Sequence, residues 1–143
     1  MNPCVVDASV AVKWILPAKS EELVPEAVHL LQLHTLGGTE LVVPDLFWSE
    51  CGNVLWKALR KGHCSKLVAE KGLATLKAYD LITIASLGLI ERAFAIASTF
   101  DRTVYDSLYV ALAVEYGIEL VTADLKLRNA LTGHFPVKWL GSL

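Results

Sequence analysis

Four acidic side chains from four distant segments lie at the end of a predicted strand, shortly after one, or in the first turn of a predicted helix. Asp7 ends the first predicted strand, and Asp124 comes two residues after a strand that ends at Thr122. Asp106 lies in the first turn of a predicted helix, and Glu50 lies one turn into the helix that follows the second strand. Because ligands bind beyond the carboxyl ends of the strands in open parallel sheets, we expect these four acids to meet at one edge.

The four acids form a ligand set made only of oxygens. Carboxylates held at close range repel one another unless a cation neutralises them, and a set without Cys or His favours Mg²⁺ or Mn²⁺ over zinc. A carboxylate-held Mg²⁺ suits phosphoryl chemistry, because it polarises a phosphate oxygen and activates a water molecule. The chain has no Walker loop, GxGxxG or GxSxG segment, so a nucleotide cradle and a serine hydrolase have no support.

Each of these acids also has an ordinary structural role open to it. Asp7 and Asp124 can cap the N-termini of helices, and Asp106 can pair with Thr103 in an arrangement that resembles a capping box. Glu50 can be a solvated acid on an amphipathic helix, although it neighbours the apolar stripe of that helix instead of opposing it. Taken one at a time, the structural role is favoured. Taken together, the four acids favour a cation site.

Two further acids have simpler interpretations. Asp45 precedes a predicted helix and is interpreted as its N-cap. Asp101 is either a fifth acid near the site or a loop residue before Thr103, and we favour the loop residue.

The elements that must position these acids alternate between short β-branched runs and longer segments of helical period. Strands are predicted at residues 3–6, 41–43, 81–85, 119–122 and 137–139. Helices are predicted at residues 21–36, 46–61, 65–78, 88–99, 103–116 and 125–131. This alternation predicts an α/β fold, a three-layer α/β/α sandwich around a mostly parallel sheet of about five strands. No repeat or linker interrupts it, so residues 1–143 are expected to form one domain.

The composition narrows the class of protein. Of the 143 residues, 54% are hydrophobic and 20% are charged, which excludes a disordered chain. The longest stretch without a charge, residues 27–39, contains two histidines, so we expect no membrane span. Three cysteines far apart, with no CxxC motif, indicate a reducing compartment. Asp7 interrupts the N-terminal segment before the apolar region of a signal peptide develops, so we expect a cytoplasmic protein.

Four segments carry a family resemblance. They are Val5-Val6-Asp7-Ala8-Ser9, Val43-Pro44 followed by Glu50, Tyr105-Asp106-Ser107-Leu108-Tyr109 with Ala111-Leu112-Ala113, and Val121-Thr122-Ala123-Asp124 with Lys126-Leu127. In this order, and over nearly the whole chain, they resemble the PIN domain. The most similar type is VapC, the toxin of type II toxin–antitoxin pairs.

The resemblance implies a Mg²⁺-dependent endoribonuclease, usually a homodimer, that a cognate antitoxin protein inhibits. Carried over residue by residue, it implies four acids for the metal site and for catalysis: Asp7, Glu50, Asp106 and Asp124. Asp7 and Asp106 are the expected direct ligands. Ser9 and Thr122 match polar positions that orient ligands or water. The alternative is a non-cleaving PIN-like module that binds RNA or protein, and the intact set of acids counts against it.

Two surface features bear on the substrate and the partner. The formal net charge of −2 would be positive without the four site acids, so the charge balance does not exclude RNA. Lys57 and Lys61 share a helical face with Glu50, and this face either contacts an RNA backbone or is merely solvated. Trp48 and Trp56 lie off the apolar stripe of the same helix, and we expect them at a dimer or antitoxin surface.

Overall fold

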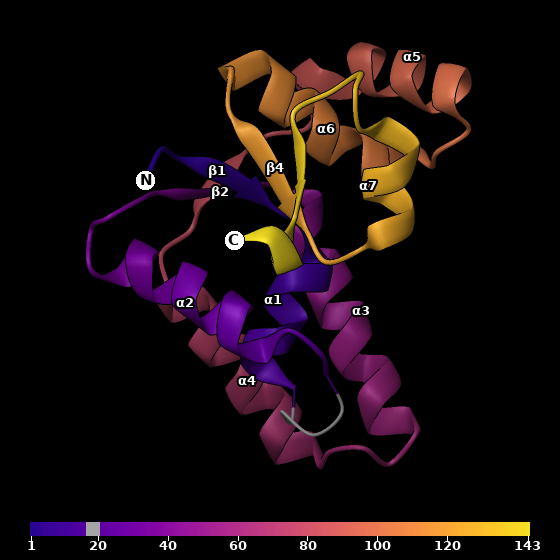
Figure 1. Cartoon of the computed structure of the whole chain (residues 1–143). Helices are drawn as coiled ribbons and strands as arrows, with labels where there is room; N and C mark the ends of the chain where they lie inside the picture. The colour runs from indigo at the N-terminus through magenta and orange to yellow at the C-terminus, as the bar shows by residue number, and fades with distance from the viewer. Residues whose placement is uncertain (17–20) are drawn as a thin grey trace.

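The computed structural model describes residues 1–16 and 21–143, which form a five-stranded sheet with helices on its two sides (Figure 1). The strands are β1 (Cys4–Val6), β2 (Leu41–Pro44), β3 (Ile82–Ile84), β4 (Glu119–Thr122) and β5 (Val137–Trp139). The helices are α1 (Ala8–Ile15), α2 (Val24–Thr35), α3 (Leu46–Arg60), α4 (Lys66–Ala78), α5 (Ile90–Phe100), α6 (Val104–Tyr116) and α7 (Leu125–Leu131). Two short 3₁₀ helices are η2 (Leu87–Leu89) and η3 (Leu140–Ser142).

The sheet has the strand order β3-β2-β1-β4-β5, and every neighbouring pair is parallel. The central strand β1 pairs with β2 on one side and β4 on the other. In the β1–β4 register Val6 lies opposite Val121, so Asp7 and Thr122, which follow them, reach the same edge of the sheet. The predicted α/β/α architecture with a parallel sheet is confirmed, and β5 is an edge strand.

The helices form two groups around the sheet. Figure 1 shows α5, α6 and α7 on one side of the strands and α1, α2, α3 and α4 on the other. On the first side α6 packs against β1, β2 and β4, and α5 packs against α6. On the second side α1 contacts α2, α3 and α4, while α3 and α4 pair as a helical hairpin that extends away from the sheet (Figure 1).

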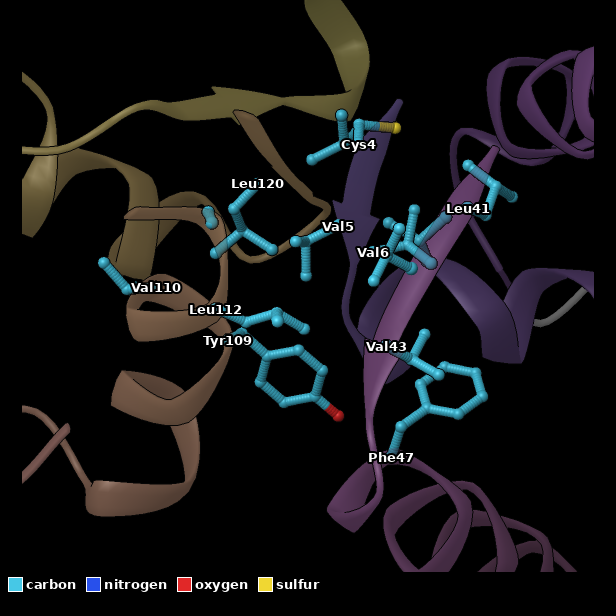
Figure 2. Packing of buried hydrophobic residues seen from close by; sticks show 14 of the residues in the cluster. Cys4, Val5, Val6, Leu41, Val43, Phe47, Tyr109, Val110, Leu112 and Leu120 are labelled. Carbon is cyan, nitrogen blue, oxygen red and sulfur yellow. The ribbon is translucent and has the colours of Figure 1, made fainter. Parts of the chain in front are cut away.

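Helix α6 lies in the centre of the first side and is buried almost all round. Seven consecutive residues, from Ser107 to Ala113, are inaccessible or nearly so, because the sheet covers one face of the helix and α5 covers another. Tyr109 and Leu112 from this helix meet β1 residues in the core shown in Figure 2. In the described part of the chain, no helix is both long and apolar enough to cross a membrane.

Two helices differ most from the sequence prediction. Helix α1 was not predicted, because its eight residues include β-branched Val10 and Val12 and are too short to establish a helical period. The second predicted helix begins at Val24 instead of residue 21, since Pro25 lies in its first turn and Leu23 before it adopts a left-handed conformation, φ 58°. Proline is tolerated in a first turn and not further inside a helix.

Truncation of Leu112, a buried residue of α6, tests the packing of the core. Leu112 has no exposed surface, so truncation leaves a cavity, and we expect Leu112→Ala to lower the free energy of unfolding by about 2 to 4 kcal/mol. The matched control is Leu87→Ala, because Leu87 is 84% exposed, and its effect should stay below about 0.5 kcal/mol. Chemical denaturation followed by circular dichroism measures both. Equal losses for the two variants would contradict the described packing.

Candidate active site

Asp7 stands at the junction of the central strand and the first helix. It directly follows β1, is 6% exposed, and occupies the N-cap position of α1, where its carboxylate accepts a hydrogen bond of 3.3 Å from the Val10 backbone N–H. The capping role proposed for Asp7 is therefore present in the structure. Capping is not the only interaction of this carboxylate, because both of its oxygens also accept hydrogen bonds from hydroxyl groups.

Two hydroxyl groups hold the Asp7 carboxylate from either side. Ser9 Oγ donates to Asp7 Oδ1, and Thr122 Oγ1 donates to Asp7 Oδ2 at 2.5 Å. Each hydroxyl is itself fixed by the loop after β4, since Ser9 Oγ accepts from the Ala123 N–H at 2.9 Å and Thr122 Oγ1 accepts from the Asp124 N–H at 3.0 Å. The structure thus places both predicted polar residues at Asp7 and joins the ends of β1 and β4.

The surroundings of Asp7 disfavour its negative charge. Burial raises the pKa of the Asp7 carboxyl to about 6, and the nearby charge of Asp106 adds to the increase. The hydrogen bonds from Ser9, Thr122 and the Val10 backbone act in the opposite direction, because they favour the ionised form. A carboxylate retained in such a place despite its desolvation is a candidate for a functional group.

Glu50 is half-buried on α3 and meets α6 through a tyrosine. Tyr109 Oη donates a hydrogen bond of 2.5 Å to Glu50 Oε1. Burial raises the pKa of the Glu50 carboxyl, with a further contribution from Asp106, while the Tyr109 hydrogen bond lowers it. Burial and the Glu50 charge together raise the pKa of the Tyr109 phenol, which therefore remains a hydrogen-bond donor.

Tyr109 is the site residue to which the sequence analysis gave no role. It lies three residues after Asp106 on the same helix, so both side chains emerge from one helical face. This spacing is the sequence signal that was available. Nothing in the sequence indicated the partner, because Glu50 is 59 residues away along the chain.

Asp106 lies in the first turn of α6, the helix before β4, and Asp124 is the N-cap of α7, the helix after β4. The Asp106 N–H donates to Thr103 Oγ1 at 3.0 Å, so Thr103 caps α6 as the sequence suggested. Asp124 caps α7 by accepting from the Leu127 N–H at 3.2 Å. Burial and then the charge of Asp124 raise the pKa of Asp106, and the Arg102 guanidinium lowers it.

The four predicted acids are close enough to affect one another. Asp106 raises the pKa of Asp7 and of Glu50, and Asp124 raises that of Asp106. Among the residues that the structure describes, none of the four takes part in a salt bridge. The chemistry of this donor set, oxygen ligands with an excess of negative charge, fits a hard divalent cation.

The acids do not form a ready-made coordination sphere. Within residues 1–16 and 21–143, no three His, Cys, Asp or Glu side chains are grouped closely enough to hold a metal ion. The Asp7 oxygens are instead engaged with hydroxyls, and Glu50 Oε1 is engaged with Tyr109. The structure therefore brings the acids into one electrostatic group without converging their oxygens on a point.

The two simpler acids lie outside this group. Asp45 occupies the N-cap position of α3, but its side chain makes no capping hydrogen bond, which corrects the sequence prediction. Its own backbone is helical, φ −59° and ψ −30°, whereas a capping residue is extended. Its carboxylate accepts hydrogen bonds from Ser86 Oγ and, at 3.2 Å, from the Ser86 N–H, and these bonds lower the pKa of Asp45. Asp101 is exposed and ends α5 in a left-handed conformation, φ 54°.

The basic and aromatic residues of α3 fall into two environments. Trp48 is partly buried, packs edge-on against Phe47 and donates from Nε1 to Thr83 Oγ1 at 3.0 Å, so it fastens α3 to the edge strand β3. Trp56 is 49% exposed, with the Arg60 guanidinium 5.0 Å from its ring centroid. Lys57 is exposed on the same part of the helix, and the exposed Lys61 follows directly at its C-cap.

A hollow at the opposite edge of the sheet lacks comparable chemistry. It is lined by the first residues of β1 and β4, Cys4 and Glu119, by Pro136 before β5 and by Lys138 of β5. Burial raises the pKa of the Cys4 thiol to about 12, so this cysteine is not a nucleophile at neutral pH. The carboxylates, at the other edge, remain the candidate site.

A parallel α/β/α sandwich with its acids gathered beyond the carboxyl ends of β1 and β4 defines a class of proteins that bind ligands at that edge. The model of the PIN domain family matches residues 4–130. The chain therefore belongs to the PIN domain family, and the resemblance predicted from the sequence is confirmed.

Individual relatives agree with this assignment. The chain is 37% identical over 128 residues to "Ribonuclease VapC3" of Pyrobaculum aerophilum, covering 86% of this chain and 90% of the relative. Its fold is similar to the crystal structure of PAE2754 from Pyrobaculum aerophilum, with a TM-score of 0.72, 23% identity, and 98% and 85% of the two chains covered. A toxin–antitoxin complex from Klebsiella pneumoniae gives a TM-score of 0.63 at 17% identity, covering 94% and 95%.

The raised pKa of Asp7 predicts a pH-dependent stability in the metal-free protein. The folded state binds a proton at Asp7 more tightly than the unfolded chain does, so stability falls as the pH rises from about 4 to about 6 and is constant above. Asp7→Asn removes this effect and keeps a capping side chain. We expect the variant to be more stable than the parent by about 1 to 3 kcal/mol at pH 7, and no more stable at pH 4.

Denaturant titration of both proteins in EDTA, at several values of pH, measures the difference. A stability difference that does not change between pH 4 and pH 7 would show that the Asp7 carboxyl is not held as described.

Proposed function

We propose that this protein is a Mg²⁺-dependent endoribonuclease and the toxin of a VapBC-type toxin–antitoxin pair. The observation that carries the proposal is the buried Asp7 carboxylate, which lies at the ligand-binding edge of the sheet in a group of acids without a salt-bridge partner among the described residues. The name of the Pyrobaculum relative, "Ribonuclease VapC3", supports RNA as the substrate.

In this proposal Asp7 and Asp106 hold Mg²⁺ directly, and Mn²⁺ is an acceptable substitute. Glu50 and Asp124 complete the anionic pocket. The bound cation supplies charge to polarise the scissile phosphate and to lower the pKa of an attacking water. Ser9 and Thr122 keep the Asp7 carboxylate in one orientation through their hydroxyl groups.

Either Glu50 or Asp124 serves as the general base or as a ligand to a second metal. Burial raises the pKa of the Glu50 carboxyl, and a base works best when its pKa approaches the operating pH, which supports Glu50 in this role. The water proton would then pass to the carboxylate as the phosphodiester bond is cleaved.

The RNA strand would approach along the exposed end of α3. Lys57, Arg60 and Lys61 line one shallow hollow with Trp56, which combines cations for the phosphates with an aromatic ring for stacking. The turn after α3 contains no acid, and Glu70, the acid of α4, forms a salt bridge of 3.9 Å with Lys66. The competing interpretation is that this face of α3 is only solvated and binds no RNA. Variants of Lys57 and Lys61 distinguish the two interpretations.

The proposed protein partners are a cognate antitoxin and a second copy of this chain, in the cytoplasm. The exposed apolar residues at the end of the α3–α4 hairpin support a protein partner: Trp56 is 49% exposed, Leu67 is 61% exposed and Val68 is 45% exposed. The printed title of the similar Klebsiella structure, a toxin–antitoxin complex, supports an antitoxin as one partner. Trp48 contributes less to a partner surface than the sequence predicted, because its side chain is hydrogen-bonded to Thr83 of β3.

Cleavage of RNA by the purified protein tests the proposed activity. We expect Mg²⁺-dependent cleavage that EDTA abolishes, and a loss of roughly 100-fold or more in kcat for Asp7→Asn and for Asp106→Asn, because each removes a charge from the metal site. The matched control is Asp101→Asn, whose exposed side chain lies outside the group of acids. Sequencing the cleaved ends of total RNA identifies a substrate, and the rate of cleavage of that RNA at saturation gives kcat.

Full activity of Asp7→Asn would refute the assigned site. Binding of RNA without cleavage, in the presence of Mg²⁺, would favour the non-cleaving module over the nuclease.

The proposed RNA path is tested through its salt dependence. Replacing Lys57 and Lys61 together by Ala removes two cations, so RNA affinity should fall and the slope of log K against log [salt] should decrease by about 1.5. Lys71 and Lys77, exposed on α4, form the charge-matched control pair. Fluorescence anisotropy at several salt concentrations reports both quantities. An unchanged slope, or an equal effect of the α4 pair, would remove the path from the proposal.

A further inference from the structure

The side chain of Tyr109 connects two elements of the site through the interior of the protein. The residue is 2% exposed, and its ring is part of the hydrophobic core. In Figure 2 the ring extends from α6 toward β2 and the start of α3, where Phe47 lies. Its hydroxyl donates to Glu50 Oε1 at 2.5 Å, which is a short contact for an O–H···O hydrogen bond to a carboxylate.

The Tyr109 hydroxyl binds one of the two oxygens of the Glu50 carboxylate. The phenol has one proton, and that proton is given to Glu50 Oε1. No described residue donates to Glu50 Oε2, so one carboxylate oxygen is held and the other is left open. Asp106 lies one helical turn before Tyr109, so α6 carries an acid of the site together with the group that orients another acid.

Filling of the core does not explain the hydroxyl group. A phenylalanine would pack against the same neighbours without bringing a polar atom into a buried position, where an unpaired polar group is costly. The hydroxyl is therefore accounted for by its bond to Glu50.

We propose that Tyr109 is a positioning residue of the ribonuclease site: it fixes the Glu50 carboxylate in one orientation, with Oε2 presented to the cation and the substrate. This inference rests on the proposed function. A carboxylate held in advance loses less conformational freedom when a ligand binds, so both metal affinity and turnover gain. The residue itself touches neither reactant.

The test compares Tyr109→Phe with the parent protein. Removal of the hydroxyl should weaken Mn²⁺ binding, measured by isothermal titration calorimetry without RNA, by about 5-fold. It should lower kcat for RNA cleavage in Mg²⁺ by about 10-fold while KM stays within about 2-fold, because the RNA surface is unaltered. Tyr105→Phe is the matched control: Tyr105 lies on the same helix and is 60% exposed, and its variant should resemble the parent in both measurements.

A double-mutant cycle separates positioning from a general structural effect. In a Glu50→Gln background, Tyr109→Phe should change kcat and Mn²⁺ affinity by less than about 2-fold, since the carboxylate it orients is gone. Equal losses in the two backgrounds would overturn the inference and assign Tyr109 to the core alone. A parent that cleaves RNA with Mg²⁺ and a Tyr109→Phe variant with parental kcat and Mn²⁺ affinity would overturn it too, with the proposed function intact. A parent without cleavage or Mn²⁺ binding would overturn both.

Discussion

The buried carboxylate of Asp7 is the charge around which the centre of this protein is arranged. It ends the central strand and begins the first helix, and it accepts hydrogen bonds from the backbone of α1 and from hydroxyls on α1 and β4. Those bonds exist only if β1 and β4 pair in the observed register, with Val6 opposite Val121. A slip of one residue would move Thr122 away and turn its side chain to the other face of the sheet. The pairing that builds the core is thus the pairing that holds the site.

Sequence patterns were sufficient to locate the strands and to predict that the candidate acids lie near one another, and insufficient for hydrogen bonds between distant elements. The β-branched runs around Val42 and Val121 marked strands buried on both faces, which is what a parallel sheet requires. Asp7, Glu50 and Asp124 were chosen as candidates because they follow strands, and Asp106 because it lies in the first turn of a helix. Asp45 and Tyr109, by contrast, have partners 41 and 59 residues away, and no local period or capping rule contains that information. Asp45 looked like a cap because capping is the local role of an Asp before a helix.

Helix α6 explains much of the unusually apolar composition. Its seven consecutive buried residues are covered by the sheet on one side and α5 on another, so it lacks the polar face that most helices of a small domain show. This burial also fixes the position of α6 and therefore of the side chains that it carries into the site. Asp106 and Tyr109 project from a helix whose position is fixed by packing, and sites built on such elements vary less in geometry than sites built on loops. The apolar excess is therefore tied to the site as well as to stability.

The buried acids lower the stability of the folded protein, which indicates that they serve a function other than stability. Burial raises the pKa of Asp7 to about 6, and that of Glu50 and Asp106 also rises, while neighbouring acids add to each increase. In the absence of a cation these groups destabilise the fold at neutral pH, and apolar side chains of similar size would be more favourable for stability alone. A bound cation offsets the repulsion between these acids. Because the cation binds only the folded state, its binding stabilises the fold. The three hydroxyl groups of Ser9, Thr122 and Tyr109 are consistent with this, since each holds a carboxylate in its charged form at a place where burial alone would protonate it.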